Sequence, residues 1–164
     1  MRILVLGVGN ILLTDEAIGV RIVEALEQRY ILPDYVEVLD GGTAGMELLG
    51  DMADRDHLII ADAIVSRKNT PGTIMVLRDD EVPALFTNKI SPHQLGLADV
   101  LSALRFTGEF PKRLTLVGVI PESLEPHIGL TPTIEAMITP ALEQVLLALR
   151  ESGVEVIARE GTHV

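Results

Sequence analysis

The chain contains no cysteine, no tryptophan, two tyrosines and three phenylalanines among its 164 residues. Without a thiol it forms no disulfide and has no thiolate nucleophile. It has 13 lysines and arginines against 24 acidic residues. This balance, with so few aromatic rings, argues against a nucleic-acid partner, which calls for basic patches and usually for stacking platforms. The net charge of −11 leaves two interpretations open, solubility or a partner that is basic or carries a metal.

Long apolar runs are also missing. No stretch approaches the roughly 20 residues that a membrane-spanning helix requires, and the longest candidate, Val145–Leu149, is a short helical face. The N-terminal segment lacks the small residues of a signal-peptide cleavage site and is typical of a buried first strand. We therefore expect a cytoplasmic protein with no membrane partner.

What is present is a regular alternation of strand and helix patterns over one domain, 1–164, with a tail that frays from about residue 159. Hydrophobic residues make up 48% of the chain, which suits a largely buried sheet. Strand patterns cover 2–6, 35–39, 57–61, 73–77 and 113–119, and helical patterns cover 15–29, 44–52, 91–105 and 131–152. This order predicts an α/β fold, a mostly parallel, twisted five-stranded sheet with helices on both faces.

Several local features carry their own predictions. Residues 79–92 form the longest predicted loop, because Pro83 and Pro92 act as breakers. Ser91 and Gln94 have the spacing of a capping box at the start of the next helix. Pro140 is expected to kink or split the last helix, and 154–157 to add an edge strand.

In such sheets ligands bind beyond the carboxyl ends of the strands. The segments expected there are 7–15, 40–43, 62–66 and 120–129. The segment before His93 reaches the same edge if the strand over 73–77 runs parallel to its neighbours.

The first of these segments resembles a nucleotide-binding turn but lacks its essential parts. After Gly7 and Gly9, the third glycine position of the dinucleotide fingerprint holds Leu12. Asp15 and Glu16 lie in the first helical turn, where they repel phosphate and attract a cation. We therefore expect no nucleotide, and tight-turn geometry accounts for the glycines.

Three residues from separate segments form the candidate site. Glu16, Asp62 and His93 supply two carboxylates and one imidazole, a set that suits nickel or zinc. Each also has an ordinary explanation: dipole complementation by Glu16, turn capping by Asp62 and a solvated helix start for His93. At a helix N-terminus the imidazole is expected to stay neutral near pH 7.

Other polar residues are weaker candidates. Asp40 precedes two glycines and has two interpretations, a role in the site or the formation of a turn. His57, at the head of a strand, is expected to be structural. His127 follows a strand and has a weaker placement near the site.

Four short motifs resemble those of the nickel–iron hydrogenase maturation endopeptidases. They are Gly7–Gly19, Asp40-Gly41-Gly42-Thr43, Asp62-Ala63 and Ser91-Pro92-His93-Gln94. They occur in the family's order across the whole chain. Ala17 stands where many relatives have glycine, a departure that leaves the candidate metal set untouched.

The resemblance implies an endopeptidase, metal-dependent or aspartic in type, that removes a short C-terminal extension from the precursor of the hydrogenase large subunit. Its partner is the nickel-loaded precursor, and the substrate's nickel acts as the recognition handle. Glu16, Asp62 and His93 are the implied metal-contacting and catalytic positions, and Asp40 is assigned speculatively as an assisting base. Zinc or cadmium is expected to substitute for nickel in the isolated protein. The alternative is a non-enzymatic nickel-binding chaperone of hydrogenase assembly.

Overall fold

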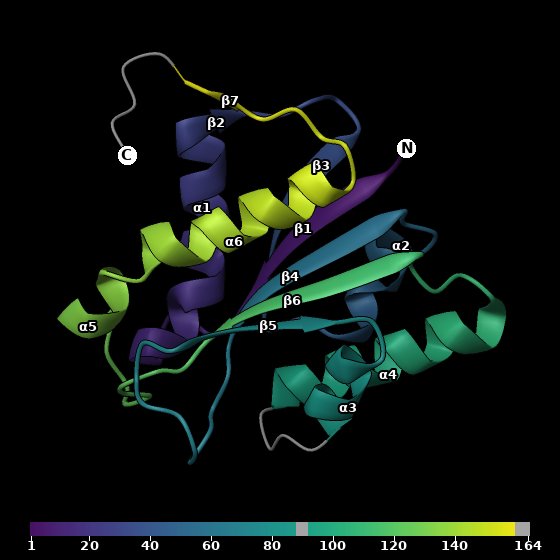
Figure 1. Cartoon of the computed structure of the whole chain (residues 1–164). Helices are drawn as coiled ribbons and strands as arrows, with labels where there is room; N and C mark the ends of the chain where they lie inside the picture. Colours follow the sequence, from purple (N-terminus) through teal and green to yellow (C-terminus); the bar gives the residue numbers. More distant parts are fainter. Residues whose placement is uncertain (88–91, 160–164) are drawn as a thin grey trace.

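The computed structural model describes residues 1–87 and 92–159, and it is built around a five-stranded sheet (Figure 1). The strands lie in the order β3-β1-β4-β6-β5. Their bounds are β1 (Ile3–Val8), β3 (Val36–Gly42), β4 (His57–Ala63), β5 (Ile74–Arg78) and β6 (Arg113–Val119). The first four in this order run parallel, and β5 is antiparallel to β6. The predicted α/β fold with a mostly parallel sheet is confirmed.

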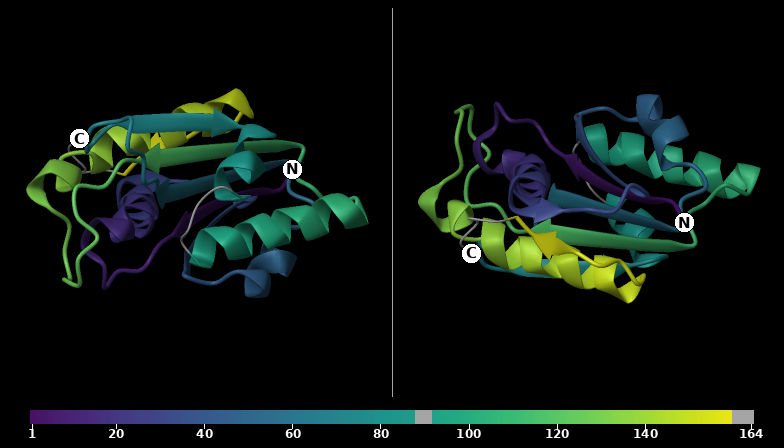
Figure 2. Two further views of the ribbon diagram at one scale, coloured as in Figure 1. Left: turned by 90° about the horizontal axis from the view of Figure 1, so that it is seen from below. Right: turned by 90° about the horizontal axis from the view of Figure 1, so that it is seen from above.

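Helices cover both faces of the sheet (Figure 2). On one face lie α1 (Ile18–Arg29) and α6 (Ile138–Glu151), which pack against each other and against the central strands. On the other face lie α3 (Glu81–Thr87) and α4 (Pro92–Thr107), with the short pair η2 (Met46–Leu48) and α2 (Leu49–Met52). In residues 1–87 and 92–159 no helix has the length and apolar character needed to cross a bilayer.

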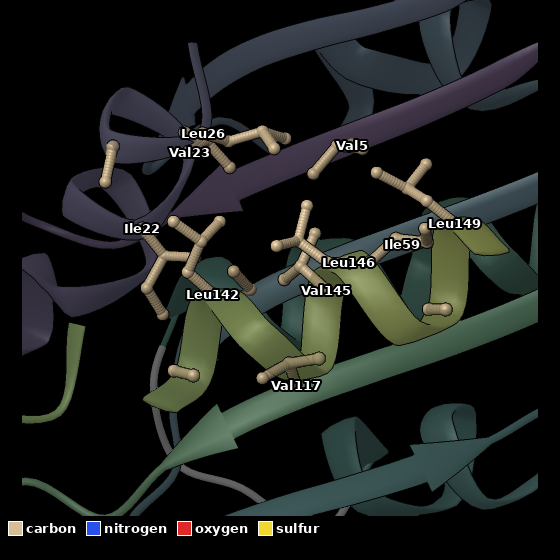
Figure 3. Close-up of a cluster of buried hydrophobic side chains, with 14 of the residues drawn as sticks. Val5, Ile22, Val23, Leu26, Ile59, Val117, Leu142, Val145, Leu146 and Leu149 are labelled. Atoms are coloured by element: carbon tan, nitrogen blue, oxygen red, sulfur yellow. The ribbon is translucent and has the colours of Figure 1, made fainter. Parts of the chain in front are cut away.

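A cluster of buried apolar side chains forms the core between the sheet and the α1–α6 layer (Figure 3). Val5, Ile59 and Val117 from three adjacent strands face Ile22 of α1 and Val145 of α6, and none of these side chains is exposed. Burying a side chain of this size stabilises the fold by about 1.5–3 kcal/mol. Because β1 and β4 are buried on both faces, their sequences are continuous apolar runs, which is why they were predictable.

The predicted loop over 79–92 is wrong in part, since α3 occupies Glu81–Thr87. Pro83 is the third residue of this helix, where a backbone N–H has no intrahelical partner, so the missing donor costs nothing. The predicted cap at Ser91 lies outside the described residues.

The last predicted helix is split, as expected from Pro140. The short helix α5 (Pro132–Glu135) ends before α6 begins, and Pro140 is the third residue of α6. Because Pro140 has no backbone N–H, it cannot form the helical hydrogen bond to the carbonyl of Ala136. The helix is therefore interrupted between Glu135 and Ile138.

The C-terminal strand pairs differently from the prediction. Rather than extending the main sheet, β7 (Ile157–Ala158) pairs antiparallel with β2 (Tyr30–Ile31) in a separate two-stranded sheet. It lies beyond α6 and next to the end of α1 (Figure 1). The tail expected to fray falls almost entirely in 160–164, outside the described residues.

His57 is structural, as expected. It starts β4 and is buried between Ser152, whose Oγ lies 2.7 Å from Nδ1, and Thr115, whose Oγ1 lies 2.8 Å from Nε2. Burial, aided by the nearby charge of Arg113, lowers the pKa of the imidazole to about 4. The ring is therefore neutral in the folded protein near pH 7.

This burial predicts a specific loss of stability in acid. Between pH 6.5 and about 4 the unfolded chain binds a proton at His57 that the folded chain does not. The free energy of unfolding therefore decreases as the pH is lowered through this range, by up to roughly 3 kcal/mol. Urea unfolding at several pH values in this range, compared between the wild type and His57→Gln, checks it. The variant should lose less stability on acidification, and equal losses would contradict the assignment.

Candidate active site

The site lies at the carboxyl edge of β1 and β4, where two glycines allow the first helical segment to approach the sheet. Gly9 has a φ of +137°, and a Cβ there would overlap the carbonyl oxygen of Glu16. A Cβ at Gly19 would overlap the carbonyl oxygens of Ala61 and Val8. This close packing brings η1 (Thr14–Ala17) and its Glu16 onto the ends of the strands. The glycines thus serve backbone packing rather than phosphate binding.

His93 joins the two carboxylates of the predicted set. Its Nδ1 lies 3.2 Å from Oε1 of Glu16, and its Nε2 lies 3.2 Å from Oδ1 of Asp62. Glu16 comes from η1, Asp62 from the end of β4 and His93 from the first turn of α4. The structure thus brings together all three residues that the sequence selected.

The three residues meet although the fourth strand, β5, does not run parallel to its neighbours, which was the condition named for His93 to reach this edge. Because β5 is antiparallel, it ends at the opposite edge of the sheet. The chain comes back to the site edge by the start of α4, since His93 there contacts Asp62.

Asp62 is fully buried and surrounded by donors. Its Oδ1 accepts the N–H of Ala63 at 2.8 Å, and its Oδ2 accepts Nε2 of Gln94 at 2.8 Å. Gln94 also donates to the carbonyl of Ala63 at 3.0 Å. The capping box predicted for Gln94 pairs it with Ser91, which lies outside the described part of the chain. The contact of Gln94 with Asp62 is a role that the sequence did not predict. Its place beside His93 in the sequence was the only signal for this role.

The protonation state of His93 differs from the expectation. Burial alone lowers its pKa, but the hydrogen bonds and charges of Asp62 and Glu16 outweigh burial and raise the pKa to about 9. Burial in turn raises the pKa of Asp62 above its usual value. The prediction of a neutral imidazole was wrong, because two carboxylates act on the ring more strongly than the helix N-terminus.

A cavity of about 1040 Å³ opens in front of Glu16 and His93. Its walls come from five segments at the carboxyl edge of the sheet. They include Asn10, Leu13, Glu16, Thr43, Gly45, Val65, Ser66, Arg67, Lys68, Pro92, His93, Gln94 and Leu124. The lining thus combines two basic side chains, Arg67 and Lys68, with the carboxylate of Glu16.

Asp15 has a different role from its neighbour Glu16. Its buried carboxylate accepts the N–H groups of Glu122 and Ser123 at 2.9 Å and that of Thr131 at 2.8 Å. It thereby fixes the segment after β6 beside η1. Of the two acids expected to attract a cation, only Glu16 faces the cavity.

The weaker candidates lie outside this group. Asp40 is exposed, and its Oδ1 accepts the N–H of Gly42 at 2.9 Å, which gives it the turn role named as its alternative. His127 is exposed, and its backbone bonds Leu12 and Thr14. Neither side chain is among those that line the cavity. The assignment of Asp40 as an assisting base stays a prediction.

Comparison with known proteins identifies the family. A family model described as hydrogenase maturation protease matches residues 20–148. The chain belongs to the hydrogenase maturation proteases. It is 91% identical over 163 residues to the hydrogenase 2 maturation protease of Escherichia coli strain K12, covering 99% of each chain. The fold matches the hydrogenase maturating endopeptidase HybD from E. coli with a TM-score of 0.96 and 90% identity, over 99% of this chain and all of that one.

A more distant structure has the same fold. The [NiFe] hydrogenase maturation protease HybD from Thermococcus kodakarensis is 25% identical, with a TM-score of 0.74 over 90% of this chain and 99% of that one. The protease described here is accordingly an endopeptidase of hydrogenase maturation, a hydrolase that acts on a large-subunit precursor. This assignment decides against the non-enzymatic chaperone.

The three site residues of the protease are linked in a row rather than gathered around one point. Glu16 and Asp62 lie on opposite ring nitrogens of His93. Within the part of the chain that the structure describes, no group of three or more His, Asp or Glu side chains is arranged to hold an ion. A metal contacted by all three therefore requires at least one of the imidazole hydrogen bonds to open.

Replacing Gln94 tests how the protease holds Asp62. In Gln94→Leu, Oδ2 of Asp62 and the carbonyl of Ala63 lose their buried donor, so the free energy of unfolding should fall by about 1–3 kcal/mol. Cleavage of the precursor should lose about tenfold or more in kcat with little change in KM, because the reacting groups are displaced rather than substrate contacts. Gln28→Leu, at an exposed position of α1, is the matched control. An unchanged kcat in Gln94→Leu would show that Gln94 does not position the site.

Proposed function

We propose that this protease removes the C-terminal extension of a nickel–iron hydrogenase large-subunit precursor after nickel insertion, and that the substrate's nickel is what Glu16, Asp62 and His93 recognise. The observation that carries the proposal is the linkage of these three side chains, from η1, β4 and α4: Glu16 and His93 line one cavity, and Asp62 is buried behind His93. The name of the Thermococcus relative, a [NiFe] hydrogenase maturation protease, supports nickel as the metal concerned.

The protonated state of His93 supports the proposal that the metal arrives with the substrate. A metal binds the lone pair of a neutral imidazole, so it has to displace the proton that the two carboxylates stabilise. This competition disfavours free nickel at neutral pH. A metal already held by the precursor has the additional binding energy of the surrounding peptide, and zinc or cadmium at high concentration is expected to take the same place in the isolated protein.

The residues also supply what peptide hydrolysis needs. Contact between the site and the substrate's metal fixes the scissile bond in the cavity, and the metal polarises the carbonyl or a water molecule. Addition of water to the carbonyl is followed by breakage of the C–N bond. The leaving nitrogen then takes the proton that the attacking water gives up, and Asp62 orients the ring of His93 throughout. The distal residue Asp40 keeps the role of an assisting base only as a prediction.

The experiment is the intact mass of purified large-subunit precursor after incubation with this protease. Nickel-loaded precursor should lose a C-terminal peptide, and nickel-free precursor should not. His93→Ala should lower the rate on the loaded precursor by about 100-fold or more, since both the metal contact and the link between Glu16 and Asp62 are lost.

His127→Ala is the matched control, because this histidine is exposed and outside the cavity, and it should cleave at the wild-type rate. Equal cleavage of nickel-free and nickel-loaded precursor would contradict the recognition of nickel. Wild-type activity in His93→Ala would contradict the proposed site.

A further inference from the structure

The cavity carries two basic residues that the proposed mechanism does not use. Arg67 and Lys68 are exposed, are adjacent in sequence and are the basic side chains among those that line the cavity. They lie in the connection between β4 and β5, which extends away from the sheet in Figure 1. The strand that places Asp62 in the site thus continues directly into the segment that carries both basic residues.

This segment has a defined shape. Ile64 donates its N–H to the carbonyl of Val119 at 2.9 Å, which ties the start of the connection to β6. The hydroxyl of Ser66 then accepts the N–H of Lys68 at 3.3 Å and Nδ2 of Asn69 at 3.0 Å. Four consecutive residues, 65–68, therefore form one wall of the cavity, with both cations on it.

Arg67 and Lys68 differ from most other described basic residues of the chain in their lack of protein partners. Across residues 1–87 and 92–159, neither the Arg67 nor the Lys68 side chain has an ion pair or hydrogen bond with the protein, and Arg150 in the last turn of α6 shares this property. The other described arginines and lysines donate to carboxylates, hydroxyls or carbonyls. These donors are Arg2, Arg21, Arg29, Arg55, Arg78, Arg105, Lys112, Arg113 and Arg159.

The charge of the molecule makes the pair significant. With a net charge of −11, the protein repels an acidic peptide at long range, and the site itself adds Glu16 and Asp62. Two cations without a partner among the described residues, both in the lining of the cavity, oppose this repulsion locally. A polypeptide substrate offers carboxylates as its anions, either as acidic side chains or as its terminal group, and arginine and lysine are the donors that bind them.

We propose that Arg67 and Lys68 form a carboxylate-binding subsite that holds the precursor segment next to the cleaved bond. The inference rests on the proposed function, because it places that segment in the cavity beside Glu16 and His93. The subsite contributes to substrate binding and not to the chemical step, so it acts on KM.

Steady-state cleavage of nickel-loaded precursor tests this subsite. Arg67→Gln/Lys68→Gln should raise KM roughly three- to tenfold with kcat unchanged, and the difference from wild type should shrink at high salt. The matched control is Arg150→Gln/Lys112→Gln, which removes the same charge away from the cavity and should leave KM at the wild-type value.

Two altered precursors separate the sources of the carboxylate. In one, the acidic residues flanking the cut are replaced by amides, and in the other a Gly-Ser tail moves the terminal carboxylate away. Removal of the carboxylate that binds the subsite should raise the KM of the wild type. It should cause no further rise in the KM of Arg67→Gln/Lys68→Gln, which has already lost the subsite.

The two proposals fail in distinguishable ways. If the wild type cleaves the loaded precursor but Arg67→Gln/Lys68→Gln keeps the wild-type KM, the subsite is refuted and the proposed function stands. A KM raised equally in the Arg150 control would also refute it, because net charge alone would then explain the effect. If the wild type does not cleave the loaded precursor, the proposed function itself fails.

Discussion

The buried carboxylate of Asp62 is the constraint on which the rest of the site depends. An unpaired charge at the end of a central strand would cost several kcal/mol, so the fold has to surround it with donors. The N–H of Ala63, the amide of Gln94 and the ring of His93 meet this need. Since two of these donors come from the first turn of α4, the position of that helix and the geometry of the site are fixed by the same contacts. The opposite nitrogen of His93 then holds Glu16.

Two aspartates are fully buried at this edge of the sheet, and their partners separate their roles. Asp15 accepts backbone N–H groups and the hydroxyl of Thr131, all from the segment after β6, so it shapes a wall of the site. Asp62 faces an imidazole, a group that can exchange a proton or bind a metal. A buried aspartate bound to backbone N–H groups is a structural device, whereas one bound to a titratable side chain has chemistry available to it.

The sequence was sufficient for the features that depend on local pattern or on strand ends. The buried strands β1, β4 and β6 are largely apolar, and Glu16, Asp62 and His93 each lie near the end of an element. The helix over Glu81–Thr87 was missed because Pro83 is compatible with a first turn and was taken as a breaker. The direction of β5 depends on which neighbour it pairs with, a tertiary property that the sequence of a short strand does not carry.

The features of the site that the sequence did not predict have a common physical origin. His93 was expected to be neutral from its place at a helix start, and no sequence pattern indicated that Gln94 binds Asp62. In the structure both residues respond to Asp62, about thirty positions away in the chain. Asp15 likewise binds residues more than a hundred positions away. Long-range hydrogen bonds to buried charges are the interactions that sequence patterns represent least well.

The central claim is that Glu16, Asp62 and His93 act as one unit joined by the imidazole. A double-mutant cycle in single-turnover cleavage of nickel-loaded precursor tests it most directly, with Glu16→Gln, Asp62→Asn and the combined variant. A linked unit predicts that the combined variant is about as slow as the slower single variant, because either change already disrupts the unit. Rate losses that multiply in the combined variant would show that the two carboxylates act independently, and would contradict this account.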